Sequence, residues 1–353
     1  LTLRMYRRSR EGGRSEAALD DFAVARELLA RAPSSPRLRG HLLNSAGAAL
    51  LAIGDLPQAE QALRSALADQ LAALGPRHVE VGYTLSNLAK VAPTQEERET
   101  RMLQALAIFE SELGEAHPHS AEIRIAATSV ITDPRTSVEL LRKGCSALDR
   151  LAVDQVSQRA QCLAHLAGLY DECGEASAAR EARERAARLA RQIPPDDATL
   201  GVPEVALILG YAALGDGRLD EARAGLRAEL KALESTSEWW QQLLRAELQL
   251  CLGLGLAAEG RRPEAVEAVA AAVGGYEALV DAGTVRDVSL QRGLGRARVE
   301  LASLLAKGGD AVEQQRARAE LDAAERWYER AGDAFAWRLD QITALRVRIA
   351  GEP

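Results

Sequence analysis

The sequence has few aromatic residues and few cysteines, and each of these two shortages narrows the classes of protein to which the chain can belong. Aromatic residues make up 4% of the 353 positions, and runs of β-branched residues are scarce, which argues against a sheet-rich core. The four cysteines form no Cys-x-x-Cys pair and show no spacing typical of a disulfide scaffold. We therefore expect them to be small apolar helix residues of a protein in a reducing compartment.

Long hydrophobic runs are also missing. The longest, residues 248–258, falls short of the roughly 20 residues that span a bilayer, and no secretory signal opens the chain. The net charge of -7 argues against a nucleic-acid-binding surface, which is usually basic. We expect a cytoplasmic protein that binds neither membrane nor nucleic acid. Because the first residue is Leu1 rather than Met, we also expect a piece of a longer protein.

No motif in the chain predicts catalysis. Residues 255–262 have the glycine spacing of a phosphate-binding loop, but they lack its Lys-Ser/Thr ending and follow a helical segment rather than a strand. We predict no metal site at His117-Pro118-His119, because its similarity to His78 one repeat earlier indicates loop residues. We expect no enzyme activity, cofactor or metal in this segment, although a catalytic domain upstream stays open.

The sequence does contain an internal repeat. Four segments begin with Gly and carry Ala five residues later, and the last three of their glycines are 43 residues apart; the four are Gly54, Gly174, Gly217 and Gly260. A fixed period of this size predicts an array of similar units, each burying its apolar face against a neighbour. Ala, Leu, Glu and Arg dominate the composition, so the units are expected to be helical.

Each unit predicts two helices around its turn glycine. A small residue stands seven positions before that glycine, where it lets two helices approach closely; these residues are Gly47, Ala167, Gly210 and Gly253. The turn glycine suits a cap with positive φ, and the alanine five positions later is expected where the two helices cross. The second helices are expected at residues 56–74, 177–192, 219–233 and 263–280.

This arrangement of small residue, turn glycine and crossing alanine resembles the tetratricopeptide repeat. Residues 65–89 and 104–118 resemble its kinesin-light-chain variety, with Ala-Leu and Leu-Gly pairs ahead of a histidine. The segment Leu85-Ser86-Asn87-Leu88-Ala89 is similar to the Leu-Asn-Asn-Leu-Ala of that variety, although Ser86 replaces its first asparagine. Val79 also departs from the pattern, because the variety has proline after the histidine.

The resemblance implies an all-α fold, a right-handed α-solenoid of about eight helix–turn–helix units over residues 17–335. Residues 1–16 are then a basic linker or the end of an upstream region, and residues 336–353 form a capping helix and tail.

In arrays of this variety the first helix of each unit lines a concave groove, and groove asparagines bind the backbone of an extended peptide. Asn87 matches that pattern and Asn44 matches it approximately, whereas Arg124 and His165 depart from it. The groove candidates are Asn44, Ser45, Ser86, Asn87, Arg124 and His165, and the alternative for each is a solvated groove residue.

Trp239 and Trp240 offer a second candidate site. Adjacent residues of a helix point about 100° apart, so one indole can be core while the other is an exposed anchor for a partner.

The resemblance implies a protein–protein interaction scaffold that binds a partner peptide or helix in its groove. The favoured context is the docking or regulatory part of a larger bacterial signalling protein, with a Ser/Thr kinase first among them. One alternative is an effector-sensing accessory domain of an ATPase or transcription regulator that binds a small molecule, which a deep pocket with buried charges would favour. A weaker alternative is an oligomerisation module. The partner's identity and the oligomeric state stay open.

Overall fold

The computed structural model describes residues 35–150, 155–194, 197, 200–216, 219–236, 238–283, 287–308, 310–331 and 335–350, with six helical residues between 20 and 31. Within these residues there are fifteen α-helices, α3–α17, and no strand, which confirms the all-α expectation. The helices fall into two compact units. The expected linker at residues 1–16 lies outside the described residues.

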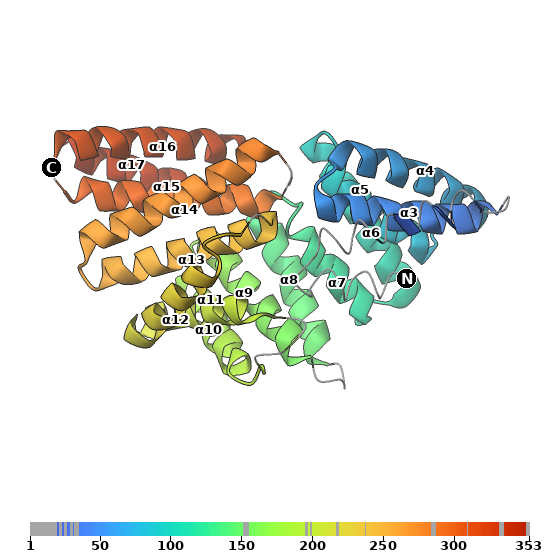
Figure 1. Cartoon of the computed structure of the whole chain (residues 1–353), viewed down its shortest axis with the longest axis horizontal. Helices are drawn as coiled ribbons and strands as arrows, with labels where there is room; N and C mark the ends of the chain where they lie inside the picture. The colour runs from blue at the N-terminus through green and yellow to red at the C-terminus, as the bar shows by residue number, and fades with distance from the viewer. Residues whose placement is uncertain are drawn as a thin grey trace. The chain divides into compact units, whose positions relative to one another are not determined.

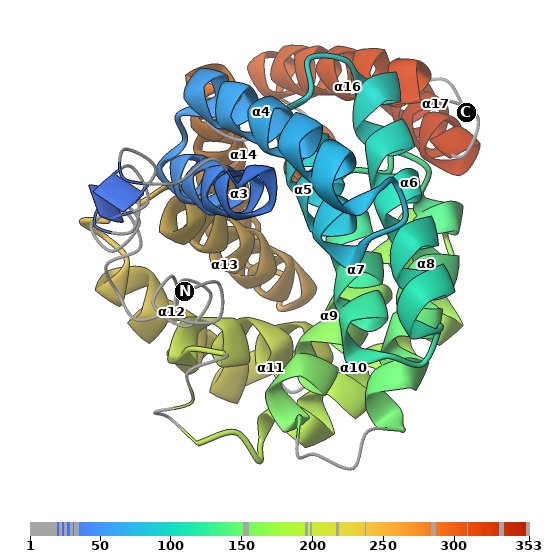
Figure 2. The same ribbon diagram turned by 90° about the vertical axis from the view of Figure 1, so that its right-hand side faces the viewer.

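Unit 1 consists of successive helices that pack on their neighbours in the chain: α3 on α4, α4 on α5, α5 on α6 and α6 on α7. Figure 2 shows α3, α4 and α5 side by side. The bounds are α3 (Pro36–Ile53), α4 (Leu56–Leu74), α5 (Val79–Val91), α6 (Gln95–Leu113), α7 (Pro118–Ala127) and α8 (Pro134–Asp149), of which unit 1 holds the part from Leu140 onward.

Unit 2 continues the same pattern, and Figure 1 shows α13 to α17 lying side by side. Its complete helices are α9 (Val156–Glu172), α10 (Ala176–Ala190), α11 (Val202–Asp216), α12 (Leu219–Ala232), α13 (Trp239–Ala258), α14 (Arg262–Ala282), α15 (Val288–Ala306), α16 (Ala311–Ala331) and α17 (Ala336–Ala350). The expected capping helix is therefore present as α17. None of the helices in the described part of the chain is both long enough and apolar enough to cross a bilayer.

The turn glycines have the backbone conformation that the repeat predicts. Gly54, Gly174 and Gly260 have φ values of 82°, 76° and 77°, in the left-handed region that favours glycine. Gly217 lies outside the described residues. The alanines five positions after the three described glycines, Ala59, Ala179 and Ala265, are each 0% exposed, so these alanines sit where helices cross.

The small residues ahead of the turns allow close helix contacts, also as predicted. A Cβ atom at Gly47 would lie 2.5 Å from Leu63 Cγ, and one at Gly210 would lie 2.9 Å from Cys251 Sγ. At Gly253 it would lie 2.4 Å from Val269 Cγ2. Any side chain at these positions would therefore push two helices apart.

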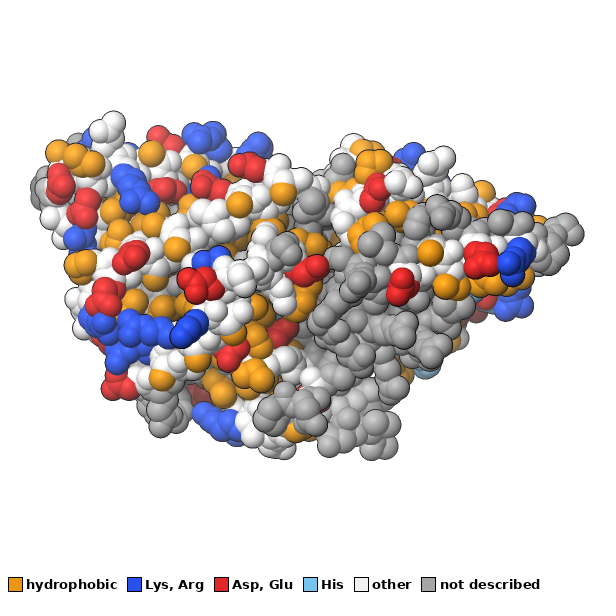
Figure 3. Space-filling model, viewed as in Figure 1, with side chains coloured by type: hydrophobic (Ala, Val, Ile, Leu, Met, Phe, Trp, Pro, Cys, Tyr) orange, Lys and Arg blue, Asp and Glu red, His pale blue; other side chains and the backbone are white. Residues whose placement is uncertain are grey.

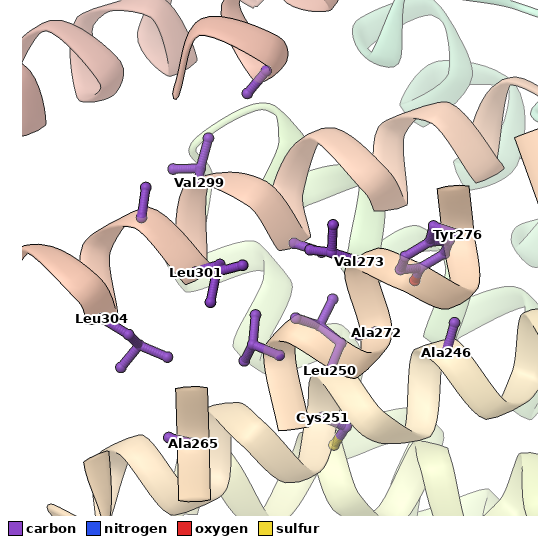
Figure 4. Close-up of a cluster of buried hydrophobic side chains, with 14 of the residues drawn as sticks. Ala246, Leu250, Cys251, Ala265, Ala272, Val273, Tyr276, Val299, Leu301 and Leu304 are labelled. Atoms are coloured by element: carbon purple, nitrogen blue, oxygen red, sulfur yellow. The ribbon is translucent and has the colours of Figure 1, made fainter. Parts of the chain in front are cut away.

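The largest buried cluster belongs to unit 2 and joins α13, α14 and α15. Figure 4 shows Leu250 of α13 on the side of Val273 of α14 and Leu301 of α15, whereas Cys251 points to the other side of α13. Tyr276 closes one end of this cluster and is 0% exposed. Each helix pair thus buries its apolar face against the next pair, as expected of a repeat array.

The structure confirms the expectation for two histidines and corrects the expectation for two cysteines. His78 and His117 are the N-caps of α5 and α7, and the Nδ1 atom of each accepts a hydrogen bond from a backbone N–H two residues later. They are structural turn residues, as predicted. Cys173 and Cys251 are free, but Cys145 and Cys162 are disulfide-bonded, which corrects the expectation of four reduced cysteines.

Candidate functional site

Polar residues of the first two helix pairs meet inside unit 1. Asn44 on α3 and Thr84 on α5 are both buried, and Thr84 Oγ1 lies 3.1 Å from Asn44 Oδ1. The same hydroxyl lies 2.7 Å from Oε1 of Gln70 on α4, a side chain that is 1% exposed. Asn87 Nδ2 donates to Asn44 Oδ1 over 3.1 Å. These four residues form what we call the asparagine cluster.

Asn44 and Asn87 are the two asparagines of the entire sequence, and they stand 43 residues apart. They occupy equivalent places on the first helices of successive units. Asn44 is buried, whereas Asn87 is half-buried, and among the described residues nothing donates a hydrogen bond to its Oδ1. Asn87 can therefore accept a hydrogen bond from an added group while it stays tied to Asn44.

The two predicted serines lie deeper than their asparagine neighbours. Ser45 is 3% exposed and Ser86 is 4% exposed. Ser86 Oγ lies 3.9 Å from Sδ of Met102 on α6. The Ser45 hydroxyl has no hydrogen-bond partner among the described residues. Both side chains are buried, and a role for them in partner binding stays a prediction.

Arg124 on α7 is 1% exposed and firmly held. Its Nε and Nη2 atoms donate to Glu110 Oε1 over 3.0 Å and 2.5 Å, and its Nη1 atom donates to the Glu115 carbonyl over 2.7 Å. The arginine thus ties α7 to the end of α6 and the loop after it. This burial is deeper than expected of a groove residue that reaches a partner through its head group.

The remaining predicted residues lie in unit 2. His165 on α9 is exposed. Trp239 and Trp240, at the start of α13, are both half-buried, and Trp239 packs against the large core of the unit. Neither indole stands out as an exposed anchor, so their partner-binding role also stays a prediction.

A polar network in unit 2 has no counterpart in the sequence analysis. Its centre is Glu247 on α13, which accepts hydrogen bonds from the hydroxyl groups of Tyr276 on α14 (2.5 Å) and Tyr211 on α11 (3.4 Å). The Arg296 guanidinium carbon of α15 lies 5.4 Å from the centroid of the Tyr211 ring. Arg296 Nη2 also lies 3.6 Å from Asp171 Oδ2 of α9. Four first helices, α9, α11, α13 and α15, therefore contribute to one network.

Burial raises the pKa of the Glu247 carboxyl above its ordinary value, although the Tyr276 hydrogen bond and the Arg296 charge act in the opposite direction. The pKa values of Tyr211 and Tyr276 are also raised, by burial first and by the negative charge of Glu247 second. Both phenols consequently stay protonated and donate to Glu247.

The raised pKa of Glu247 predicts a pH dependence of stability. Folding binds a proton here, so the free energy of unfolding falls as pH rises from the unfolded pKa, about 4.3, through the folded pKa. Glu247→Gln keeps the shape of the side chain, with the amide NH₂ donating to one of the two hydroxyl groups, and removes this loss. We expect its stability relative to the parent to increase between pH 4.5 and 7 in urea denaturation. A relative stability that decreases over this range would show that Arg296 outweighs burial.

The two ends of unit 2 also contact one another. Trp337 Nε1 of α17 donates to the carbonyl of Glu172, the last residue of α9, over 2.6 Å. Arg338 Nη2 lies 3.3 Å from Glu172 Oε1, and both side chains are buried. The Arg338 guanidinium carbon lies 4.1 Å from the centroid of the Trp337 ring. These partners are 165 residues apart, and no local signal in the sequence indicates them.

The surface of unit 2 carries both signs of charge. Figure 3 shows acidic and basic side chains over α13–α16 with apolar side chains between them.

In the described part of the chain, no group of three or more His, Cys, Asp or Glu residues is arranged to hold a metal ion.

No family model matches this chain, and no curated protein sequence does. Several solved structures are similar to it. BtubC (BKLC) from P. vanneervenii is 18% identical, with 53% of this chain and 83% of that chain covered and a TM-score of 0.46. Repeats of a putative kinesin light chain from Podosopora anserina are 19% identical, with 56% and 94% covered and a TM-score of 0.46. A Rap protein complexed with competence and sporulation factor is 12% identical, with 89% and 99% covered and a TM-score of 0.46.

At these identities and TM-scores we base no argument on the three likenesses. The chain's own features define its architecture: helix pairs, turn glycines with positive φ, small residues at close crossings and a closing helix. The described residues therefore form an all-α array of helix–turn–helix repeats.

Proposed function

We propose that this chain is a protein–protein interaction scaffold and that the first helices of unit 1 bind an extended segment of a partner protein. The observation that carries the proposal is the Asn44–Asn87 pair, at equivalent positions of successive repeats. A peptide segment offers alternating N–H and C=O groups, and an amide side chain can pair with either. Asn44 Oδ1 accepts a hydrogen bond from Asn87 Nδ2 and so orients the Asn87 side chain, while Asn87 Oδ1 stays available as an acceptor.

The energetic role of such a contact is modest but specific. One hydrogen bond contributes about 1 kcal/mol net, so asparagines fix the register of a segment while apolar anchors supply most of the affinity. The favoured setting is the docking or regulatory part of a larger bacterial signalling protein, with a Ser/Thr kinase as the first choice. This setting rests on analogy with arrays of the same variety.

The alternative of a small-molecule effector site receives less support. Glu247, Arg296 and Asp171 are charged groups inside unit 2, which is the feature such a site needs, but they are paired with tyrosines or with one another. We therefore base no effector site on them.

Peptides selected from a random display library on the full chain test the docking proposal. Asn87→Ala is expected to weaken their binding about tenfold, because it removes the amide that sets the register of the peptide. The matched control is Gln61→Ala, which removes an exposed amide from α4, the second helix of a pair. Equal binding of selected peptides to the parent and to folded Asn87→Ala would contradict the proposal.

A further inference from the structure

Unit 1 contains a second feature that the asparagine cluster does not use. A hollow of about 360 Å³ lies between the α6–α7 loop, α7 and α8, within the usual size range of ligand sites. We call it the basic hollow. It is lined by Glu115, Ala116, Arg124, Arg142, Lys143, Ser146, Ala147 and Arg150.

A contact between two helices places these side chains together. At Gly144 α8 packs on α7 at ordinary contact distance, since an added Cβ would lie 3.5 Å from the Ala121 carbonyl oxygen and 3.6 Å from Arg124 Cβ. Lys143, Ser146 and Arg150 follow one another at spacings of three and four residues, so they share one face of the helix. That face looks into the hollow beside Arg124.

The charge in the hollow is opposite to that of the chain. Four lining residues are basic and Glu115 alone is acidic, whereas the whole protein has a net charge of -7. Glu110 offsets part of the positive charge, because it pairs with Arg124. Lys143 and Arg150 are exposed and project their charges at the solvent side. The Ser146 hydroxyl adds a neutral hydrogen-bond donor.

Helix electrostatics account for part of this cluster but not all of it. Arg150 follows the last residue of α8, where a positive charge is favourable next to the helix dipole. Lys143 lies in the middle of the helix and gains nothing from the dipole. Arg124 is already held by Glu110 and the Glu115 carbonyl, so the exposed cations of Lys143 and Arg150 beside the Ser146 hydroxyl are the feature that points to a ligand.

We propose that the basic hollow binds a phosphoryl group, carried either by a peptide partner or by a small molecule. A phosphoryl group has a charge near -2 and three strong acceptor oxygens, which the cations of Lys143 and Arg150 and the Ser146 hydroxyl can satisfy. In the peptide case the inference rests on the proposed function, since Arg124 belongs to the predicted groove, and it then names the partner's chemistry. In the small-molecule case it stands independently.

Fluorescence anisotropy on the full chain at low salt tests the proposal. The probes are a labelled pentapeptide with a central phosphoserine and its unphosphorylated twin, with inorganic pyrophosphate measured by calorimetry. Lys143→Glu/Arg150→Glu is expected to weaken binding of a phosphoryl probe at least about tenfold. The control Arg64→Glu/Arg77→Glu makes the same change of net charge at exposed sites of unit 1 and is expected to stay within about twofold.

The outcomes separate the two sources and the two proposals. Binding of the phosphopeptide, lost in Lys143→Glu/Arg150→Glu, supports the peptide source, whereas binding of pyrophosphate alone supports the small-molecule source. The inference is overturned if neither phosphoryl probe binds better than the unphosphorylated peptide, or if the control variant loses as much binding. Display-selected peptides that depend on Asn87 but not on Lys143 would leave the docking proposal intact while the hollow fails.

Discussion

Gly253→Ala is expected to lower the free energy of unfolding of unit 2 by about 3 kcal/mol, despite the added helix propensity of alanine. The new Cβ would lie 2.4 Å from Val269 Cγ2 and 3.2 Å and 3.3 Å from the Val269 nitrogen and the Ala265 oxygen. A side chain can rotate away, but two backbone atoms of α14 cannot. The helices α13 and α14 must therefore separate where both pack into the largest core of the chain.

Gly274→Ala on α14 is the matched control, because nothing lies within 4 Å of the added Cβ. Alanine is favoured over glycine by up to about 1 kcal/mol in a helix, so this variant should be at least as stable as the parent. In thermal denaturation we expect the apparent Tm of Gly253→Ala to be about 6–12 °C lower. A Tm for Gly253→Ala equal to that of the control would show that the helices accommodate the methyl group.

Arg338→Ala is expected to cost unit 2 about 3–5 kcal/mol, because it leaves the Glu172 carboxylate buried without its charged partner. Glu172 is 6% exposed and Arg338 is 3% exposed, so water cannot replace the lost interaction cheaply. The substitution also removes the cation from the face of the Trp337 ring. Denaturation in urea and hydrogen exchange of α9 and α17 would measure the loss.

Two further variants distinguish this explanation from a general weakening of α17. Arg346→Ala removes an ion pair of the same helix, with Asp322 and Glu325, but its side chain is 36% exposed. Its expected cost is below about 1 kcal/mol. Glu172→Gln/Arg338→Met removes both charges and should recover much of the loss of Arg338→Ala. A double variant as unstable as the single one would contradict a charge-based origin.

Local features of the fold could be predicted from the sequence. The helix at 56–74 begins and ends where expected, since Asp55 caps its start and Gly75 follows its end. Positive φ at Gly54 and the close approach at Gly47 follow from the repeat pattern in the same way. Each of these features depends on residues within a single repeat, so a short stretch of sequence is enough to predict it.

Contacts between helices of unit 2 that lie far apart in the sequence could not be predicted. In the sequence, Glu247 does not differ from the many surface glutamates of helices. The two tyrosines lie beside it because α11, α13 and α14 pack together. Trp337 and Glu172 are separated by most of unit 2.

The candidate site was predicted in part. Asn44 and Asn87 are brought together, because equal positions of neighbouring repeats lie on adjacent first helices. The sequence did not show that Arg124 is buried, since its partners are Glu110 and the Glu115 carbonyl of the preceding helix and loop. It also gave no sign of the basic hollow, whose residues come from two helices that meet at Gly144.

Photo-crosslinking of a display-selected peptide to the full chain tests the central claim most directly. With a benzophenone residue in the peptide and mass-spectrometric mapping of the adducts, we expect crosslinks on α3 and α5 around Asn44 and Asn87. Competition by the unlabelled peptide should abolish them. Crosslinks confined to the second helices α4 and α6, or to unit 2, would contradict the account that the first helices of unit 1 form the partner-binding face.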